Sequence, residues 1–256
     1  MTHHEEILVV GYPKSGNTWL TRLVAELVGC PVNGFFEQPN NLDVAIEGSD
    51  RKSNYRVYKG HQSFSEVQGK IADHNLIYVV RDVRDIVLSG ASFFKFPART
   101  LIEKVICTLP PTKKRYSNQL LHSKKRKVRE MIRTLDQGNI HVPWCSVPWD
   151  IHVKQYLEHG GLIIRYEDLL EQPEESCKCI LSHLRLTRNL DQIHAAINNQ
   201  SFKTIKEKFK QKHDKRRDTF LRQGKRGEWK QQLSHEQMTF LSDRFATMLQ
   251  QLGYVN

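Results

Sequence analysis

Short apolar runs alternate along the chain with segments in which apolar positions recur every three or four residues. The runs cover residues 7–10, 76–80 and 162–165, and residues 55–58 alternate like a strand with one buried face. Residues 20–27 and 83–94 have the spacing of helices that bury one face. Strands alternating with helices predict an α/β fold with a central parallel sheet, right-handed crossovers and helices on both faces. We expect a single domain over residues 1–256.

The same periodicity predicts further helices at residues 63–72, 150–159, 173–184, 191–209 and 234–252. The last of these begins with Ser234 and Gln237, a spacing typical of a capping box. Residues 31–50 and 210–230 are rich in polar and turn-forming residues and predict loops. Residues 97–148 interrupt the alternation with paired prolines and a basic stretch. We expect an insertion or lid there, with a helix in its middle, over one end of the sheet.

The loop between the first strand and the first helix has the architecture of an anion-binding site. Gly11 and Gly16 let the backbone approach a ligand, and the N–H groups and dipole of the following helix favour negative charge. The nucleotide-triphosphate loop reads G-x-x-x-x-G-K-[ST]. Here Asn17 and Thr18 follow Gly16, and the lysine comes earlier, at Lys14. The domain is therefore P-loop-like: the glycine-rich phosphate-binding loop is present, but its lysine lies before the second glycine instead of after it.

Polar residues follow three of the predicted strands. Lys14 and Ser15 come after the first, Lys59 and His61 after the second, and Arg81 after the third. Singly, each has a structural explanation, because a lone histidine is more often structural and an arginine commonly pairs with a nearby carboxylate. Ligands of such sheets bind at the carboxyl ends of the strands. The joint placement therefore indicates one functional crevice.

Charge and composition narrow the class of ligand and the compartment. The chain has 39 Lys and Arg against 28 Asp and Glu, a net charge of +11, which suits an anionic ligand or a solubilising surface. Five cysteines without paired spacing argue against a disulfide framework and against a zinc site. The chain shows no secretory signal and no apolar run near the roughly 20 residues of a membrane span. We expect a soluble, cytoplasmic protein that contacts no membrane.

Three segments, in order, carry a resemblance to a known family. Gly11–Trp19, which reads GYPKSGNTW, closely resembles the phosphosulfate-binding loop of the soluble sulfotransferases. Tyr78–Ser89 resembles the strand-and-helix motif that holds a 3′-phosphate in that family. Phe220–Lys230 is similar to the family's R-K-G-x-x-G-D-W-K signature. The likeness spans nearly the whole chain except residues 97–145.

The resemblance implies a PAPS-dependent sulfotransferase. Such enzymes move a sulfuryl group from 3′-phosphoadenosine 5′-phosphosulfate (PAPS) to a hydroxyl or amine by in-line transfer and release adenosine 3′,5′-bisphosphate (PAP). It implies His61 as general base, Lys14 on the bridging oxygen where charge develops, and Lys59 near the transferring group. No metal is required, because the lysine stabilises the developing charge. The implied cofactor-binding residues are Lys14, Ser15, Gly16, Asn17, Thr18, Trp19, Arg81, Ser89, Tyr166, Ser201, Phe202, Arg222, Gln223 and Gly224.

Within this set, the backbone N–H groups of residues 15–18 are implied to bind the 5′-phosphate. Arg81, Ser89 and Arg222 are implied to bind the 3′-phosphate, which suits an arginine fork. Gln223 stands where the family signature has a lysine, so one charge on that phosphate is missing.

Aromatic residues are implied to bind the adenine. Trp19 and Phe202 resemble the pair that stacks on the ring, with Tyr166 at its edge and Ser201 as a further hydroxyl contact. Core packing would also account for Trp19, and strand-end packing for Tyr166.

The acceptor cannot be named from the sequence. The stretch from Lys113 to Arg133 is strongly basic, which suits an anionic small-molecule or carrier-bound acceptor, or the solvated face of a lid. Nucleic acid is a weaker alternative, because the stretch lacks interleaved aromatics for base stacking. An apolar acceptor pocket could instead be lined by Phe93, Phe94, Phe96, Trp144 and Trp149. The segment after Lys230 does not match the dimerisation motif of many animal members, which leaves open whether the chain forms a homo-oligomer.

Two other function classes stay open at this point. A P-loop kinase would show Mg²⁺-dependent ATP turnover, but Asn17 stands where such an enzyme has its lysine. A binding module, either a nucleic-acid binder or an inactive protein of the same fold, would show salt-dependent nucleic-acid affinity and no binding of the PAPS product.

Overall fold

The computed structural model describes residues 4–38, 46–99, 101–108, 123–211 and 226–254. These residues belong to two compact units. The first unit comprises Met1–Arg81 and Val153–Arg226, and the second comprises Asp82–His152 and Gly227–Asn256. Arg222, Gln223 and Gly224, three of the predicted site residues, lie outside the described residues.

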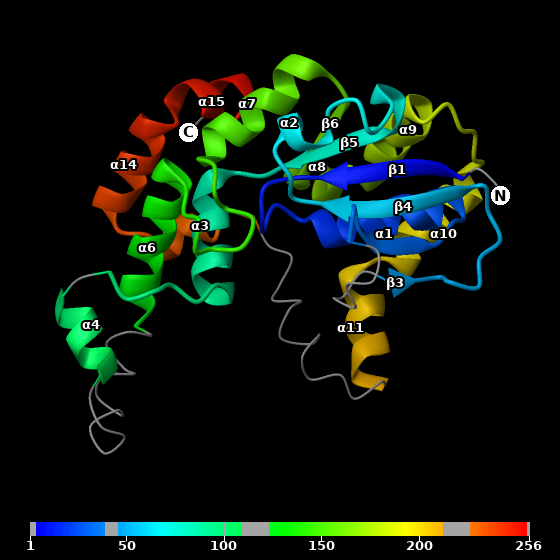
Figure 1. Ribbon diagram of the computed structural model, residues 1–256. Helices are drawn as coiled ribbons and strands as arrows, with labels where there is room; N and C mark the ends of the chain where they lie inside the picture. Colours follow the sequence, from blue (N-terminus) through cyan, green and yellow to red (C-terminus); the bar gives the residue numbers. More distant parts are fainter. Residues whose placement is uncertain (1–3, 39–45, 100, 109–122, 212–225, 255–256) are drawn as a thin grey trace. The chain divides into compact units, whose positions relative to one another are not determined.

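The first unit contains a six-stranded sheet with the strand order β3-β2-β4-β1-β5-β6 (Figure 1). Its strands are β1 (Glu5–Val10), β2 (Val32–Phe35), β3 (Ile46–Glu47), β4 (Tyr55–Gly60), β5 (Leu76–Val80) and β6 (Leu162–Arg165). Five strands run parallel, and only the edge strand β3 is antiparallel to its neighbour β2. The predicted parallel sheet is therefore confirmed, and the four predicted strands are β1, β4, β5 and β6.

The prediction of an uninterrupted loop over residues 31–50 is wrong. Strand β2 has the sequence VNGF, whose Asn and Gly are poor strand formers, so no local signal marks it. It forms because it pairs in parallel with β4, where Val32 faces Val57 and Phe35 faces Lys59. Pairing with a distant strand overrides the local preference.

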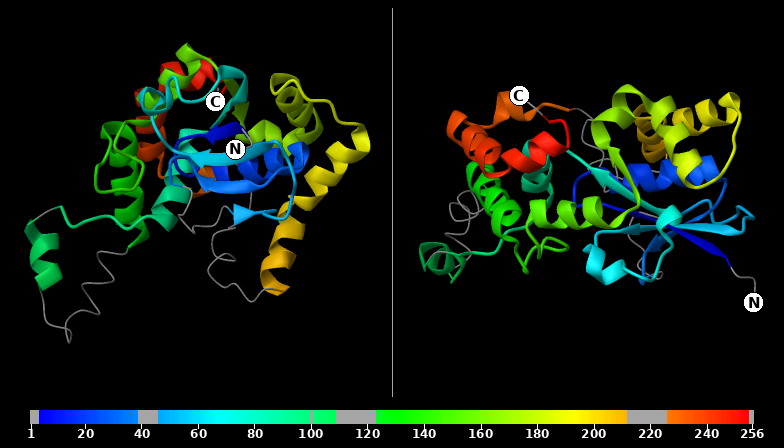
Figure 2. Two further views of the ribbon diagram at one scale, coloured as in Figure 1. Left: turned by 45° about the vertical axis from the view of Figure 1, so that its right-hand side comes forward. Right: turned by 90° about the horizontal axis from the view of Figure 1, so that it is seen from above.

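Helices cover both faces of the sheet, as predicted (Figure 2). The helices of the first unit are α1 (Asn17–Val28), α2 (Phe64–Val67), α8 (Tyr166–Glu171), α9 (Pro173–His183), α10 (Leu190–Asn199), α11 (Phe202–Gln211) and the part of α7 (Trp149–His159) from Val153 onward. A 3₁₀ turn, η1 (Asp73–Asn75), precedes β5.

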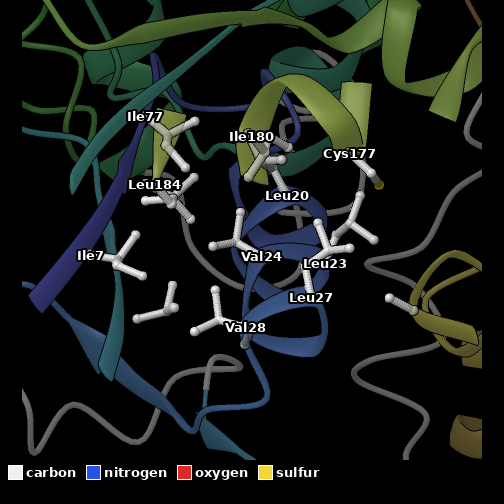
Figure 3. Close-up of a cluster of buried hydrophobic side chains, with 14 of the residues drawn as sticks. Ile7, Leu20, Leu23, Val24, Leu27, Val28, Ile77, Cys177, Ile180 and Leu184 are labelled. Atoms are coloured by element: carbon white, nitrogen blue, oxygen red, sulfur yellow. The ribbon is translucent and has the colours of Figure 1, made fainter. Parts of the chain in front are cut away.

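The main core lies between one sheet face and α1, α9 and α10 (Figure 3). Alternate strand residues such as Ile7 and Ile77 enter it together with Leu20 and Leu23 of α1. The intervening residues face the opposite side, where Tyr78 of β5 stacks on Tyr156 of α7 at 4.3 Å between ring centroids. Both faces are thus buried, which explains why the central strands read as continuous apolar runs.

Two predicted helix boundaries need correction in this unit. The helix expected over residues 191–209 is two helices, because the chain leaves helical geometry at Gln200 between α10 and α11. The helix expected over residues 63–72 ends at Val67, and its capping box joins Ser63 and Glu66. The periodicity marked these segments as helical but could not show where they turn.

The second unit is helical. Its helices are α3 (Val83–Phe93), α4 (Leu101–Thr108), α6 (Lys124–Gln137), the first residues of α7, α13 (Trp229–Gln232), α14 (His235–Arg244) and α15 (Ala246–Gln251). A Cβ on Gly90 of α3 would clash with the Met131 sulfur of α6, so α3 and α6 pack closely. The predicted capping box of Ser234 and Gln237 is confirmed, but the predicted helix breaks at Phe245.

Part of the basic stretch has internal partners in the second unit. The carboxylate of Glu130 is 2% exposed and lies 3.4–3.7 Å from the guanidinium groups of Arg99, Arg129 and Arg133. Arg126 donates to the Glu103 carboxylate at 2.8 Å. Some of the arginines of α6 therefore stabilise the helical unit instead of forming a plain solvated face.

Two buried cysteines are expected to resist thiol reagents in the folded protein. Burial raises the pKa of Cys30 and of Cys177 to about 12, so their reactive thiolate is scarce at mildly alkaline pH. Cys179 is exposed and serves as the internal control. Mass spectrometry after brief iodoacetamide treatment should find Cys179 modified before Cys30 and Cys177. Equally fast modification of Cys30 without denaturant would contradict this prediction.

Among the residues that the structure describes, no helix is both long enough and apolar enough to cross a membrane.

Candidate functional site

The loop between β1 and α1 has unusual backbone geometry. Gly16 is the N-cap of α1 with φ 106°, and no side chain caps the helix there. Lys14 has φ 75°, a left-handed conformation that few residues with a Cβ adopt and that marks candidate functional sites. The Ser15 hydroxyl is fully buried and has no hydrogen-bond partner among the described residues. These features fit a site that receives an anion at the start of a helix.

Arg81 joins this loop to an aromatic cluster. Its guanidinium donates to the Lys14 carbonyl at 3.3 Å and lies 4.4 Å from the centre of the Tyr166 ring. Trp19 meets Tyr166 edge to face at 5.7 Å, and a Cβ on Gly16 would touch the Tyr166 ring at 2.5 Å. The structure thus brings together Lys14, Gly16, Trp19, Arg81 and Tyr166, all of them predicted site residues.

His61 lies against the same loop from the end of β4. Its Nδ1 is 2.8 Å from the Gly11 carbonyl oxygen and 3.2 Å from the Asn17 amide nitrogen. Lys59 and His61 are both buried, and both lie near Phe35 of β2. The Lys59 nitrogen is 4.6 Å from the centre of the Phe35 ring, and the ring centroids of His61 and Phe35 are 6.1 Å apart. The three strand ends predicted to converge therefore do so.

The predicted adenine contacts lie near the start of α11. The indole N–H of Trp19 donates to the Gln200 carbonyl at 2.8 Å, which places the indole beside the residue before Ser201. The Ser201 hydroxyl donates to the Thr204 hydroxyl at 2.9 Å and accepts from the Thr204 N–H at 3.3 Å. Ser201 therefore caps its own helix, and Phe202 begins it.

Ser89 belongs to α3 in the second unit, where it is partly buried. In the same unit, the carboxylate of Asp85 accepts from the backbone N–H groups of Gly227 and Trp229 at 2.7 and 3.3 Å. Arg84 lies over the Trp229 ring at 3.9 Å. Sequence reasoning assigned Asp85 no such role. The sequence shows only an acidic residue in the first turn of α3, because the partners of Asp85 are more than 140 residues away in the chain.

Tyr78 of β5 contacts the start of the loop. The phenol is fully buried, and this burial raises its pKa well above the usual value, so the ring stays neutral. It also has a backbone hydrogen bond with Tyr12. This hydrogen bond connects Tyr78 of β5 to the residue that follows Gly11 in the loop.

Gly11→Ala is expected to destabilise the fold by about 1–3 kcal/mol, as overpacking does, and to weaken anion binding at the loop. A Cβ there would meet the Val79 carbonyl oxygen at 2.5 Å and the Asn17 side-chain oxygen at 2.9 Å, and a backbone carbonyl cannot move aside. Thermal unfolding and PAP titration measure the two effects.

Gly29→Ala is the matched control at the other end of α1. Gly29 has φ 74°, and no atom of the described residues lies within 4 Å of its Cβ position, so this change should cost stability and leave PAP affinity intact. Equal PAP affinity for Gly11→Ala and Gly29→Ala would contradict the assignment of the loop.

The described residues contain no group of three or more His, Cys, Asp or Glu side chains arranged to hold a metal ion.

The sequence profile of the family described as "Sulfotransferase domain" matches residues 4–253. The match runs through both compact units, and the chain belongs to this family. Rat sulfotransferase 1A1 is 22% identical over 253 residues, covering 88% of this chain and 78% of the relative. Mouse sulfotransferase 1B1 is 24% identical over 258 residues, covering 88% of this chain and 76% of the relative.

Solved structures share the fold. Mouse sulfotransferase SULT7A1 complexed with PAP matches with a TM-score of 0.64 and 17% identity, covering 96% of this chain and 85% of that one. Retinol dehydratase in complex with androsterone and inactive cofactor PAP matches with a TM-score of 0.61 and 18% identity, covering 95% and 80%. The predicted fold class and the predicted enzyme class, a sulfotransferase, are confirmed.

Proposed function

We propose that the chain transfers a sulfuryl group from PAPS to a hydroxyl or amine of its acceptor, with His61 as general base. The main observation behind the proposal is that one loop, Gly11–Gly16, contacts both the proposed phosphate-binding arginine and the proposed general base. Its Lys14 carbonyl accepts from Arg81, and its Gly11 carbonyl lies against His61. A nucleotide held by this loop and Arg81 would therefore present its phosphosulfate close to a base.

The residues present fit the phosphates of such a nucleotide. The first turn of α1 has no side-chain cap, and the Ser15 hydroxyl has no partner among the described residues. In the proposed site, Thr18 and the N–H groups of residues 15–18 bind the 5′-phosphate, and Arg81 binds the 3′-phosphate. Ser89, Arg222, Gln223 and Gly224 join the 3′-phosphate site in this proposal on the strength of the sequence resemblance alone.

Each side chain has a defined task in the transfer. His61 takes the proton of the acceptor hydroxyl as the acceptor oxygen bonds to sulfur. Lys14 stabilises the negative charge that stays on the phosphate oxygen as the sulfur–oxygen bond breaks. Lys59 supports the transferring group from the same side of β4 as His61. A lysine in this role would let the transfer run without a metal ion.

The acceptor is proposed to be a small molecule or a carrier-bound group with a free hydroxyl or amine. Retinol dehydratase, which has a similar fold, is solved in complex with androsterone and inactive cofactor PAP. The basic residues of α6 leave an anionic acceptor open, because Lys124, Lys125, Arg129 and Arg133 are exposed there.

Calorimetric titration of PAP in the presence of a metal chelator tests the nucleotide assignment. We expect saturable binding of one PAP per chain and, in a separate titration without chelator, weaker binding of ATP with Mg²⁺. Turnover of ATP with Mg²⁺ and no PAP binding would overturn the proposal in favour of a P-loop kinase. Salt-dependent RNA or DNA binding without PAP binding would overturn it in favour of a binding module.

A further inference from the structure

The side chain of Asn17 connects two strand ends beneath the candidate base. Asn17 is the first residue of α1 and is 3% exposed. Its amide nitrogen donates to the Gly11 carbonyl at 2.9 Å, where β1 ends, and to the Gly60 carbonyl at 2.8 Å, where β4 ends. Both amide protons are thereby used. Because carbonyl oxygens only accept, the nitrogen and not the oxygen of the amide must face them.

These bonds determine which nitrogen of His61 carries a proton. The Gly11 carbonyl can only accept, so the contact of 2.8 Å requires a proton on His61 Nδ1. The 3.2 Å approach of the Asn17 nitrogen to Nδ1 is then a contact between two donors and not a hydrogen bond, since both amide protons already have acceptors. In the neutral ring, Nε2 is left with the lone pair that accepts a proton.

We propose that Asn17 is a positioning residue for His61. It fixes the Gly11 carbonyl that holds Nδ1–H, and it fixes the Gly60 carbonyl directly before the histidine, so that Nε2 is the basic atom in a set orientation. This inference rests on the proposed function, because it specifies how the proposed base is prepared. Asn17 acts here through His61 and not by touching the acceptor.

The backbone on either side of the histidine is closely packed. The backbone N–H of His61 donates to the Gln62 side-chain oxygen at 2.9 Å. A Cβ on Gly60 would meet that same oxygen at 2.6 Å and the side chains of Leu8 and Val10 at 3.2 Å. A Cβ on Gly11 would meet the Asn17 oxygen at 2.9 Å. Two glycines and one asparagine thus form a tightly packed support under the histidine.

Asn17→Ala removes both donors without adding charge, and its expected result is a kcat lower by about 10- to 100-fold, the size of effect that a misplaced catalytic group produces. PAP affinity and the KM for acceptor should change far less than kcat, because the proposed phosphate contact of Asn17 is its backbone N–H, which the change keeps. The unfolding midpoint should fall, because the Gly11 and Gly60 carbonyls lose a buried donor. Thr21→Val is the matched control, because Thr21 is buried one turn further along α1 and its hydroxyl donates only to the Asn17 backbone carbonyl at 2.7 Å.

Nitrogen-15 NMR of the His61 ring gives a readout that needs no turnover. The wild-type ring, assigned by its loss in His61→Ala, should show the tautomer protonated on Nδ1, and Asn17→Ala should mix the two tautomers. Asn17→Leu keeps a side chain of similar shape and removes both N–H donors without adding a charge or an acceptor for Nδ1. It should lower kcat as well and therefore tests the same point if Asn17→Ala does not fold.

An unchanged kcat and an unchanged ring tautomer in a folded Asn17 variant would overturn the proposal. A loss of kcat matched by an equal loss of PAP affinity would also overturn it, because that result describes a residue that holds the nucleotide loop and not the histidine. Absence of sulfuryl transfer by the wild-type enzyme would count against the proposed function instead, and the ring spectrum would still decide the role of Asn17.

Discussion

His61→Ala is expected to lower kcat for sulfuryl transfer by about 10²- to 10⁴-fold, the contribution of a positioned general base. The imidazole is buried beside the loop that is proposed to hold the phosphosulfate, with its Nδ1 held by the Gly11 carbonyl. Alanine has no group that can take up the acceptor proton. Because His61 does not contribute to the proposed phosphate contacts, PAP affinity should stay at the wild-type value.

His183→Ala is the matched control for this change. His183 is also partly buried and bonded to a backbone carbonyl, with its Nε2 3.0 Å from the Leu76 oxygen at the start of β5. It lies at the opposite end of the strands from the site and should affect stability only. Wild-type turnover by a folded His61→Ala enzyme would remove His61 from the mechanism.

Arg81→Lys is expected to weaken PAP binding by about 10- to 100-fold, the cost of losing hydrogen bonds from a charged group. The guanidinium donates to the Lys14 carbonyl and lies on the Tyr166 ring at the same time. A lysine ammonium keeps the charge but cannot present a planar group to the ring and a fork to a phosphate. Because Lys14 has a left-handed backbone, loss of this contact should also loosen the loop.

Arg188→Lys is the control for the arginine change. The Arg188 guanidinium donates to the carbonyls of Leu27 and Val28 at 2.9 Å, at the far end of α1. This variant should lose stability without losing PAP affinity, as calorimetry can establish. If Arg81→Lys bound PAP as tightly as Arg188→Lys, Arg81 would have no part in the nucleotide site.

Much of the first unit could be predicted because its signals are local. The run Leu76–Val80 is buried on both faces and reads as a strand wherever it is placed. Strand β2 could not be predicted in this way, because its Asn33 and Gly34 favour a loop and only pairing with β4 makes it extended. The break at Gln200 between α10 and α11 combines a local cap, in which the Thr204 N–H donates to the Ser201 hydroxyl, with a distant contact from the Trp19 indole.

The candidate site followed from the rule that parallel strands end at one edge. That rule placed Lys14, His61 and Arg81 together, and their contacts with one loop confirm the placement. The rule could not show how Asn17 and Gly60 meet, because they are 43 residues apart and their contact depends on the exact register of β1 and β4. The sequence motifs predicted which residues lie at the same edge of the sheet, whereas the hydrogen bonds between them depend on the packing of the folded chain.

The most direct test of the central claim is the transfer of labelled sulfuryl from PAPS to a pool of hydroxyl and amine acceptors in the presence of a metal chelator. The proposed function predicts labelled product from the wild-type chain, an acceptor mass increased by one sulfuryl group, and almost no product from His61→Ala. Unlabelled acceptors after incubation with a folded, PAP-binding wild-type chain, across hydroxyl and amine classes, would contradict it.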